Sequence, residues 1–143
     1  MINRVVFLLS IIGLLISGYL LNRYVTGGPI VCGKTAGCEI VRASSFAYFF
    51  GLPLPFFGLV FYFLIFVTSF SLTLAPERKQ ILGLSLWFQT AVGFIISLYL
   101  FFVEVSFIKA ICLWCTASGA DSLLLFVLTS VSVYNSRKHE LGN

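Results

Sequence analysis

The four cysteines of the chain form two close pairs, Cys32 with Cys38 and Cys112 with Cys115. Two cysteines separated by two residues can close a small disulfide that reopens easily, and at a helix start their thiolates are stabilised by the helix dipole. A thiolate of one pair can attack a disulfide of the other through a mixed disulfide. The residue types and their spacing therefore indicate thiol–disulfide exchange.

Two other uses of the cysteines stay open at this point. A four-cysteine zinc site needs two close thiolate pairs, and a CxxC can supply one of them. The five-residue spacing of Cys32 and Cys38 is looser than such sites usually have, and an oxidising compartment works against four free thiolates. A membrane scaffold with structural disulfides is the third possibility. A structural bridge would resist reduction by glutathione, whereas a relay pair would be labile.

The composition places these cysteines in a membrane protein. Of the 143 residues, 59% are hydrophobic and only 10% are charged, whereas about a quarter are charged in a typical soluble domain. The net charge of +4 comes from scattered Lys and Arg residues rather than a basic block, so we expect a lipid bilayer and not a nucleic acid as partner. We expect a single domain over residues 1–143.

Four long apolar stretches predict membrane-spanning helices. The first has 17 residues without a charge, and no convincing signal-peptide cleavage site follows it, so we expect it to be retained. Short polar turns join the last three stretches, which makes consecutive helices antiparallel neighbours. The fold class predicted is an all-α membrane protein, a four-transmembrane-helix bundle. The spans lie at about 5–21, 55–74, 81–103 and 110–134.

The segment between the first two spans, about 22–54, predicts a long extracytoplasmic loop that carries the first cysteine pair. Its glycines, Pro29 and charged residues cannot form irregular backbone in lipid. Residues 43–50 are polar and then aromatic, which is typical of a short helix at the membrane surface. Such a loop could face solvent at one moment and reach the second cysteine pair at another.

The distribution of basic residues predicts the orientation in the cell inner (plasma) membrane. With a cytoplasmic N-terminus, the inner segments hold Arg4, Arg78, Lys79, Arg137 and Lys138, and the outer segments hold Arg23, Lys34, Arg42 and Lys109. The inner charges are concentrated in three short segments, which favours cytoplasmic N- and C-termini. Because two spans separate Cys38 from Cys112, both cysteine pairs lie on one membrane face, which is then the oxidising one.

The electrons of such a relay need an acceptor. The sequence has no flavin or nicotinamide fold, and Thr116 rather than a haem-attachment histidine follows the CxxC. A quinone dissolved in the bilayer is the natural two-electron acceptor. The small residues 116–122 leave space for a quinone head group, although they would serve close helix packing equally well.

The whole pattern resembles the vitamin K epoxide reductase family. The residues that carry the resemblance are Cys32-x5-Cys38-Glu39-x-Val41-x2-Ser44, Tyr48, Gly51-Leu52-Pro53, Gly58, Tyr62 and Cys112-x2-Cys115. The resemblance implies a four-helix bundle around a quinone. It also implies that the loop pair takes electrons from a thioredoxin-like protein or domain, and that the CxxC pair reduces the quinone.

Residue roles follow from the resemblance. It implies that Cys32 meets the redox partner, that Cys38 passes electrons to Cys112, and that Cys115 faces the quinone. Ser44 matches the loop serine of the family.

The quinone site is assigned in the same way. Phe57 falls where the family places an aromatic residue near the quinone ring, and we expect Ser118 and Gly119 to border that pocket.

The departures from the family pattern point to a prokaryotic role. Animal members that reduce the epoxide have a longer loop spacing, an asparagine where this chain has Leu54, and a tyrosine where it has Gly119. We therefore expect a prokaryotic homologue without a fused thioredoxin-like domain, which reoxidises a separate thioredoxin-like or DsbA-like dithiol protein. Its acceptor would be ubiquinone or menaquinone, and no metal is expected.

One further ionisable residue lies deep in the last span. Asp121 follows the CxxC by about two helical turns, and an intramembrane carboxylate is a functional candidate by default. It lies on a different helix face from Cys115, so we expect it to pack against Gln89 or a loop amide rather than to react.

Overall fold

The computed structural model describes residues 2–33, 37–74 and 76–141, so Lys34 lies outside the described residues. Its main elements are four long helices: α1 (Ile2–Thr26), α3 (Leu54–Leu74), α4 (Lys79–Val103) and α5 (Leu113–Leu141). Each is long and apolar enough to cross a membrane. The chain is therefore an all-α multi-pass membrane protein, as its composition predicts.

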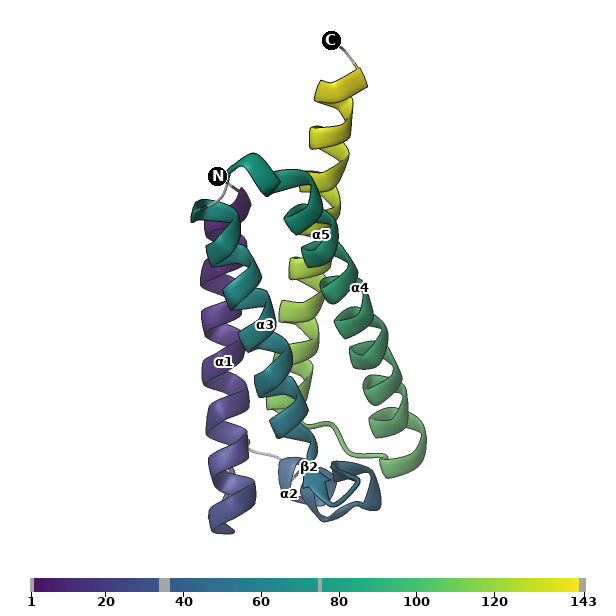
Figure 1. Cartoon of the computed structure of the whole chain (residues 1–143). Helices are drawn as coiled ribbons and strands as arrows, with labels where there is room; N and C mark the ends of the chain where they lie inside the picture. Colours follow the sequence, from purple (N-terminus) through teal and green to yellow (C-terminus); the bar gives the residue numbers. More distant parts are fainter. Residues whose placement is uncertain (1, 34–36, 75, 142–143) are drawn as a thin grey trace.

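The four helices pack as a bundle (Figure 1). Contacts are most extensive between α1 and α3 and between α4 and α5. A Cβ at Gly13 would overlap the ring of Tyr62, and one at Gly93 would overlap the ring of Phe61, so these glycines allow neighbouring helices to approach closely. Buried hydroxyls add hydrogen bonds across the bundle, such as Thr90 Oγ1 to Thr129 Oγ1 at 2.8 Å between α4 and α5.

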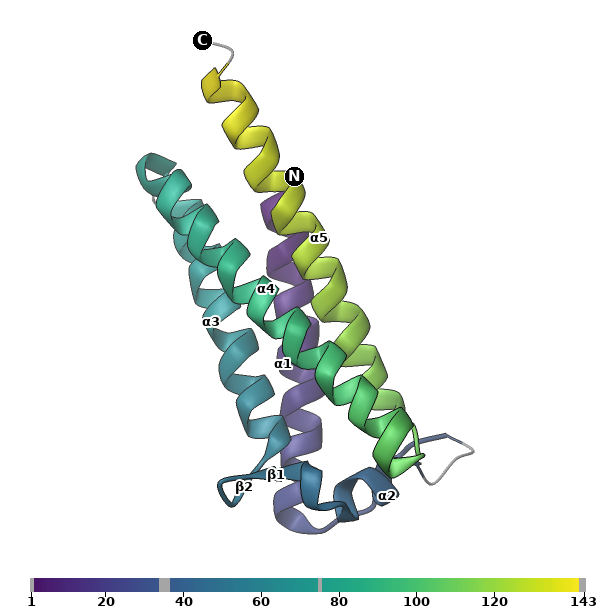
Figure 2. The same cartoon turned by 90° about the vertical axis from the view of Figure 1, so that its right-hand side faces the viewer.

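The start of α1 and the end of α5 lie at one end of the bundle, and the loop between α1 and α3 covers the other end (Figures 1 and 2). This loop contains α2 (Gly37–Ala43), a 3₁₀ turn η1 (Ser45–Ala47), and the two-residue strands β1 (Tyr48–Phe49) and β2 (Leu52–Pro53). The strands pair antiparallel. Both cysteine pairs therefore lie at the end of the bundle that the loop covers.

The short helix of the loop lies earlier than the sequence pattern predicts. The prediction of a helix over residues 43–50 is wrong, because α2 ends at Ala43 and a hairpin follows. The Val41 carbonyl at the helix end accepts two hydrogen bonds from Ser44, one from its hydroxyl at 2.7 Å and one from its backbone N–H at 3.1 Å. Phe50 and Gly51 then adopt positive φ angles, 52° and 78°, and form the tight turn of the hairpin.

The connection between α4 and α5 also differs from the expected turn. Residues Glu104–Ile108 continue α4 as a π-helical turn, η3, which ends at Lys109 in the left-handed conformation (φ 53°). An irregular segment follows, and α5 begins at Leu113 rather than near Ala110. The π turn brings the chain back toward the bundle just before Cys112.

Candidate active site

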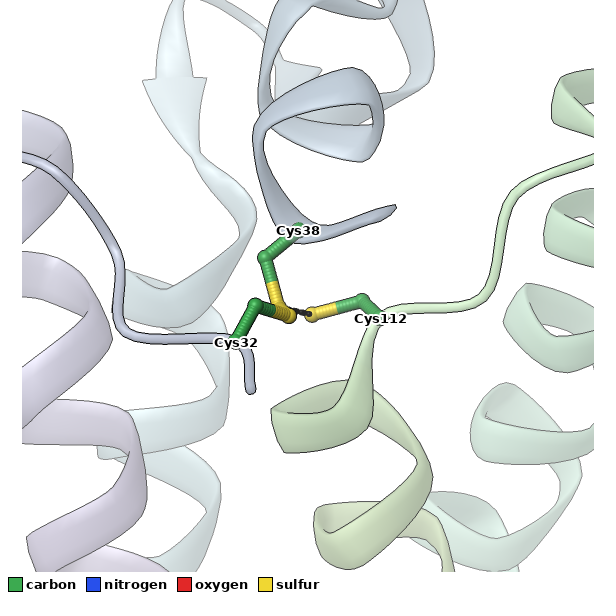
Figure 3. Close-up of side chains that lie close together, drawn as sticks. All are labelled: Cys32, Cys38 and Cys112. Atoms are coloured by element: carbon green, nitrogen blue, oxygen red, sulfur yellow. Dashed lines mark hydrogen bonds between the residues drawn. A yellow bond between two sulfur atoms is a disulfide. The ribbon is translucent and has the colours of Figure 1, made fainter. Parts of the chain in front are cut away.

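Three cysteine sulfur atoms meet where the loop touches the start of α5 (Figure 3). Cys32 and Cys38 form a disulfide with a Cα–Cα distance of 5.9 Å. The free thiol of Cys112 donates a hydrogen bond to the Cys38 sulfur at 3.2 Å. All three residues are buried. A thiol held against one sulfur of a disulfide is the arrangement from which thiol–disulfide exchange starts, with Cys38 as the sulfur attacked.

Local backbone features place these sulfur atoms together. Cys38 is the second residue of α2, and Cys112 immediately precedes α5, where its carbonyl accepts a hydrogen bond from Thr116 N at 3.0 Å. A Cβ at Gly37 would collide with the backbone carbonyl of Ile111. Glycine at this position therefore allows α2 to lie directly against the segment that carries Cys112.

Polar contacts hold the loop in this position. Glu39 accepts a hydrogen bond from Ile30 N at 2.8 Å and forms an ion pair with Arg42 at 3.3 Å. The Arg42 guanidinium also donates to the Gly28 carbonyl at 2.8 Å.

The loop segment next to Cys32 is hydrogen-bonded to the CxxC itself. Trp114, inside the CxxC, donates its indole N–H to the Val31 carbonyl at 2.7 Å, and its ring packs against Tyr19 of α1. The loop disulfide is thus held over the second cysteine pair. Of the two loop positions expected from the sequence, facing solvent or reaching the second pair, the structure has the one that allows exchange between the pairs.

The surroundings of Cys112 favour its thiolate. A hydrogen bond from the Cys115 thiol lowers the pKa of Cys112, and the backbone N–H groups of Trp114 and Cys115 act in the same direction. Burial and the nearby carboxylate of Glu104 oppose them but do not prevail. The pKa of Cys112 is therefore lower than that of an ordinary thiol, which favours reaction with a disulfide.

Cys115 lines a cavity of about 650 Å³ that is bordered by the four long helices and the loop. The wall is largely apolar, as ligand cavities usually are. The four other candidate residues, Ser44, Phe57, Ser118 and Gly119, also line the cavity. Tyr62 and Glu104 line it as well.

The cavity wall combines open space with a few polar groups. A Cβ at Gly119 would meet no atom within 4 Å, so the small residues of α5 border space rather than a tight helix contact here. The Tyr62 hydroxyl is bonded to the Ser118 carbonyl at 3.0 Å and to the Ser118 hydroxyl at 2.9 Å. The ring of Phe57 lies edge-on to Phe49 of the hairpin, with 5.9 Å between centroids.

Asp121 does not have the neighbour expected for it. The Gln89 amide donates to Thr68 at 3.2 Å and to Ser85 at 3.2 Å, so the expected contact with Gln89 is wrong. Asp121 instead lies beside the Tyr62 phenol, and its Oδ2 is buried without a hydrogen-bond partner among the described residues.

Glu104 is the residue of this site that the sequence pattern did not indicate. It lies at the end of an apolar run, where a charged residue usually indicates the start of a polar turn. A signal was present, because a carboxylate at the margin of a membrane span is a functional candidate by default. In the structure Glu104 is buried next to both cysteines of the CxxC.

A disulfide and a free thiol in contact at one end of a membrane helix bundle are what an integral membrane oxidoreductase that acts on disulfides requires. Comparison with known families agrees with this. The model of the Vitamin K epoxide reductase family matches residues 4–130, and the chain therefore belongs to that family. The family is linked in general to disulfide and quinone redox chemistry in membranes. No curated protein matches the chain.

Proposed function

We propose that the chain is a membrane thiol:quinone oxidoreductase that supports disulfide formation outside the cytoplasm. The observation that carries the proposal is the 3.2 Å contact between Cys112 and the loop disulfide, together with the position of Cys115 on the apolar cavity. One cysteine pair thus touches the other on one side and a possible acceptor site on the other.

The relay begins with a separate thioredoxin-like or DsbA-like dithiol protein. Its thiolate attacks Cys32, whose neighbours Val31 and Gly33 are exposed, and the loop disulfide is reduced as the partner becomes oxidised. Cys38 then exchanges with a Cys112–Cys115 disulfide, which is reduced to a dithiol while the loop disulfide re-forms. Two electrons have then moved from the partner to the CxxC pair.

The acceptor is a membrane quinone of the ubiquinone or menaquinone type, bound in the cavity beside Cys115. The apolar wall and the Phe57 ring suit a flat ring with an isoprenoid tail. Ser118 and Gly119 border the head group, and Ser44 supports the loop side of the cavity. The quinone takes up two electrons and two protons, and the Cys112–Cys115 disulfide forms.

The four spans and the loop act as one catalytic domain in the plasma (bacterial inner) membrane, with both termini in the cytoplasm and both cysteine pairs outside. Four of the nine basic residues then lie outside, three of them in the long loop, which agrees with the positive-inside rule applied to short segments.

The test is a coupled assay with purified protein, a reduced thioredoxin-like protein and a short-chain soluble quinone. Quinol should form, and Cys→Ala substitution of any of the four cysteines should abolish its formation. The Cys115→Ala variant should still form a mixed disulfide between Cys38 and Cys112. Normal turnover by the Cys115→Ala variant would contradict the proposal.

One observation favours a second candidate, a metal site. The sulfur atoms of Cys32, Cys38 and Cys112 lie within 4.8 Å of one another and could act as thiolate ligands if the loop disulfide were reduced. Metal analysis of the purified protein alongside a free-thiol count separates the two candidates, because bound zinc requires at least three free thiols and the relay requires a disulfide.

A further inference from the structure

Glu104 is a buried carboxylate that interacts with both cysteines of the CxxC pair. Its side chain is only 5% exposed, and its Oε2 accepts a hydrogen bond from Cys112 N at 3.3 Å. The Cys115 thiol lies close enough to interact with the same carboxylate. Glu104 and Cys115 also share the wall of the 650 Å³ cavity. The carboxylate and a reactive thiol thus both border the space proposed for the quinone.

The π-helical turn holds this side chain in place. Glu104 begins η3, and its carbonyl accepts hydrogen bonds from Lys109 N and from Ala110 N, the latter at 3.3 Å. Single π turns within helices occur frequently at functional sites. The turn therefore fixes the backbone of Glu104 at the point where the chain bends back toward Cys112.

A purely structural role does not account for a carboxylate here. A hydrogen bond to Cys112 N would be satisfied equally well by the neutral amide of glutamine, without the cost of burying a charge. In the described part of the chain, no basic side chain forms an ion pair with Glu104. The ion pair found there joins Glu39 and Arg42. What the carboxylate adds over an amide is the ability to take up a proton.

We propose that Glu104 accepts the proton of the Cys115 thiol and passes it to an oxygen of the quinone as the quinone is reduced. This inference rests on the proposed function. In the step, Cys112 reacts as a thiolate and Cys115 as a thiol, and a disulfide forms between them. The quinone gains the two electrons released and becomes quinol. One quinol proton comes from Cys115 through Glu104, which returns to its carboxylate form, and the other comes from water.

The first experiment needs no quinone, because alkylation of Cys115 also requires removal of its proton. In a Cys112→Ser background with the loop disulfide intact, Cys115 is the sole free thiol, and its reaction with iodoacetamide is followed at neutral pH. A carboxylate beside a thiol disfavours the thiolate that reacts, so Glu104→Gln should speed this reaction, whereas an unchanged rate would show that the two groups do not interact. Glu77→Gln, an exposed substitution at the opposite end of the bundle, should leave it unchanged.

The second experiment measures reduction of a short-chain quinone by the pre-reduced protein in a single turnover. Glu104→Gln should slow this step by about 10²-fold without slowing exchange between Cys38 and Cys112, because the carboxylate opposes the Cys112 thiolate. Glu104→Ala leaves room for a small carboxylate, and added formate should restore its quinone reduction.

The outcomes separate this inference from the proposed function. If Glu104→Gln alkylates or reduces quinone as fast as its parent, or if formate fails to rescue Glu104→Ala, the role of Glu104 is overturned and the relay stands. If the unsubstituted protein reduces no quinone, the proposed function fails, and the role of Glu104 fails with it.

Discussion

Cys112 is the residue where the two cysteine pairs meet, and its reactivity depends on a neighbour as much as on its helix. The position of the CxxC at a helix start already predicts stabilisation of a thiolate. The structure adds the hydrogen bond from the Cys115 thiol, the largest cause of the lowered pKa of Cys112. The two cysteines of the CxxC thus have different tasks before any disulfide forms between them.

This hydrogen bond leads to a pH prediction. Because the pKa of Cys112 is lowered, its thiolate persists as the pH falls, and its reactivity is lost only below that lowered pKa. Cys115→Ala removes the hydrogen bond, so the loss of reactivity should begin at a higher pH. The measurement is the rate of Cys112 alkylation by iodoacetamide between about pH 5 and 9, in protein with Cys32 and Cys38 replaced by Ser so that no mixed disulfide forms, and with the site identified by mass spectrometry.

The matched control is Cys115→Ser, whose hydroxyl can still donate to the Cys112 sulfur. Its profile should lie closer to that of the unsubstituted protein than the Cys115→Ala profile does. Identical profiles for all three proteins would show that the hydrogen bond does not govern the ionisation of Cys112.

Individual residues were predictable from the sequence where spacing carries the information. The four cysteines stand out because they form two close pairs. Two spans separate these pairs, which places both on one membrane face. Glu104 does not stand out, because its importance comes from the π turn that folds it back onto the CxxC. A turn of that kind depends on tertiary contacts, and no local pattern of residue types predicts it.

At the scale of elements, the contact between α2 and the segment before α5 decides whether the two pairs can exchange. Gly37→Ala would place a Cβ against the Ile111 carbonyl and push α2 away from Cys112. Misplacement of reacting groups by about 1 Å can cost about 10²-fold in rate, so exchange between Cys38 and Cys112 should slow by that order. Rapid mixing followed by acid quench and alkylation measures the exchange.

The control for this prediction is Ile40→Ala, which changes the same short helix at a side chain that is 51% exposed. It should leave the exchange rate unchanged. If Gly37→Ala exchanges as fast as Ile40→Ala, the close approach at Gly37 is not what brings the sulfur atoms together.

The long helices were predictable and the loop elements were not. Runs of apolar residues long enough to cross a bilayer identify all four spanning helices, because lipid permits few other structures. The loop has no such constraint. Its hairpin depends on positive φ angles at Phe50 and Gly51, and the glycine alone did not distinguish a hairpin turn from the end of a surface helix.

At the scale of the whole molecule, the cavity is the product of the complete bundle. All four long helices and the loop contribute to its wall, so no single segment of sequence encodes it. The small residues of α5 left open whether they serve packing or space. The absence of any atom within 4 Å of a Cβ at Gly119 favours space at that position.

A larger side chain at Gly119 should therefore compete with the quinone without unfolding the bundle. Gly119→Leu is expected to raise KM for a short-chain quinone about tenfold, as the loss of roughly 1–3 kcal/mol of apolar contact would. Exchange between the cysteine pairs should not change. The measurement is steady-state kinetics with varied quinone concentration.

Gly83→Leu provides the comparison, since Gly83 is also a helical glycine with open space around it but lies near the opposite end of the bundle. Its KM should equal that of the unsubstituted protein. Equal KM values for both variants would place the quinone elsewhere.

The position of Trp114 gives the protein a built-in optical signal. The chain has two tryptophans, and Trp114 lies between the cysteines of the CxxC with its indole bonded to Val31 of the loop, whereas Trp87 is bonded to Ser130 in the bundle. Disulfides quench excited indole on contact by accepting an electron. With Trp87 replaced by Phe, the remaining fluorescence would follow the closing of the CxxC disulfide and the release of the loop in real time, without any attached dye.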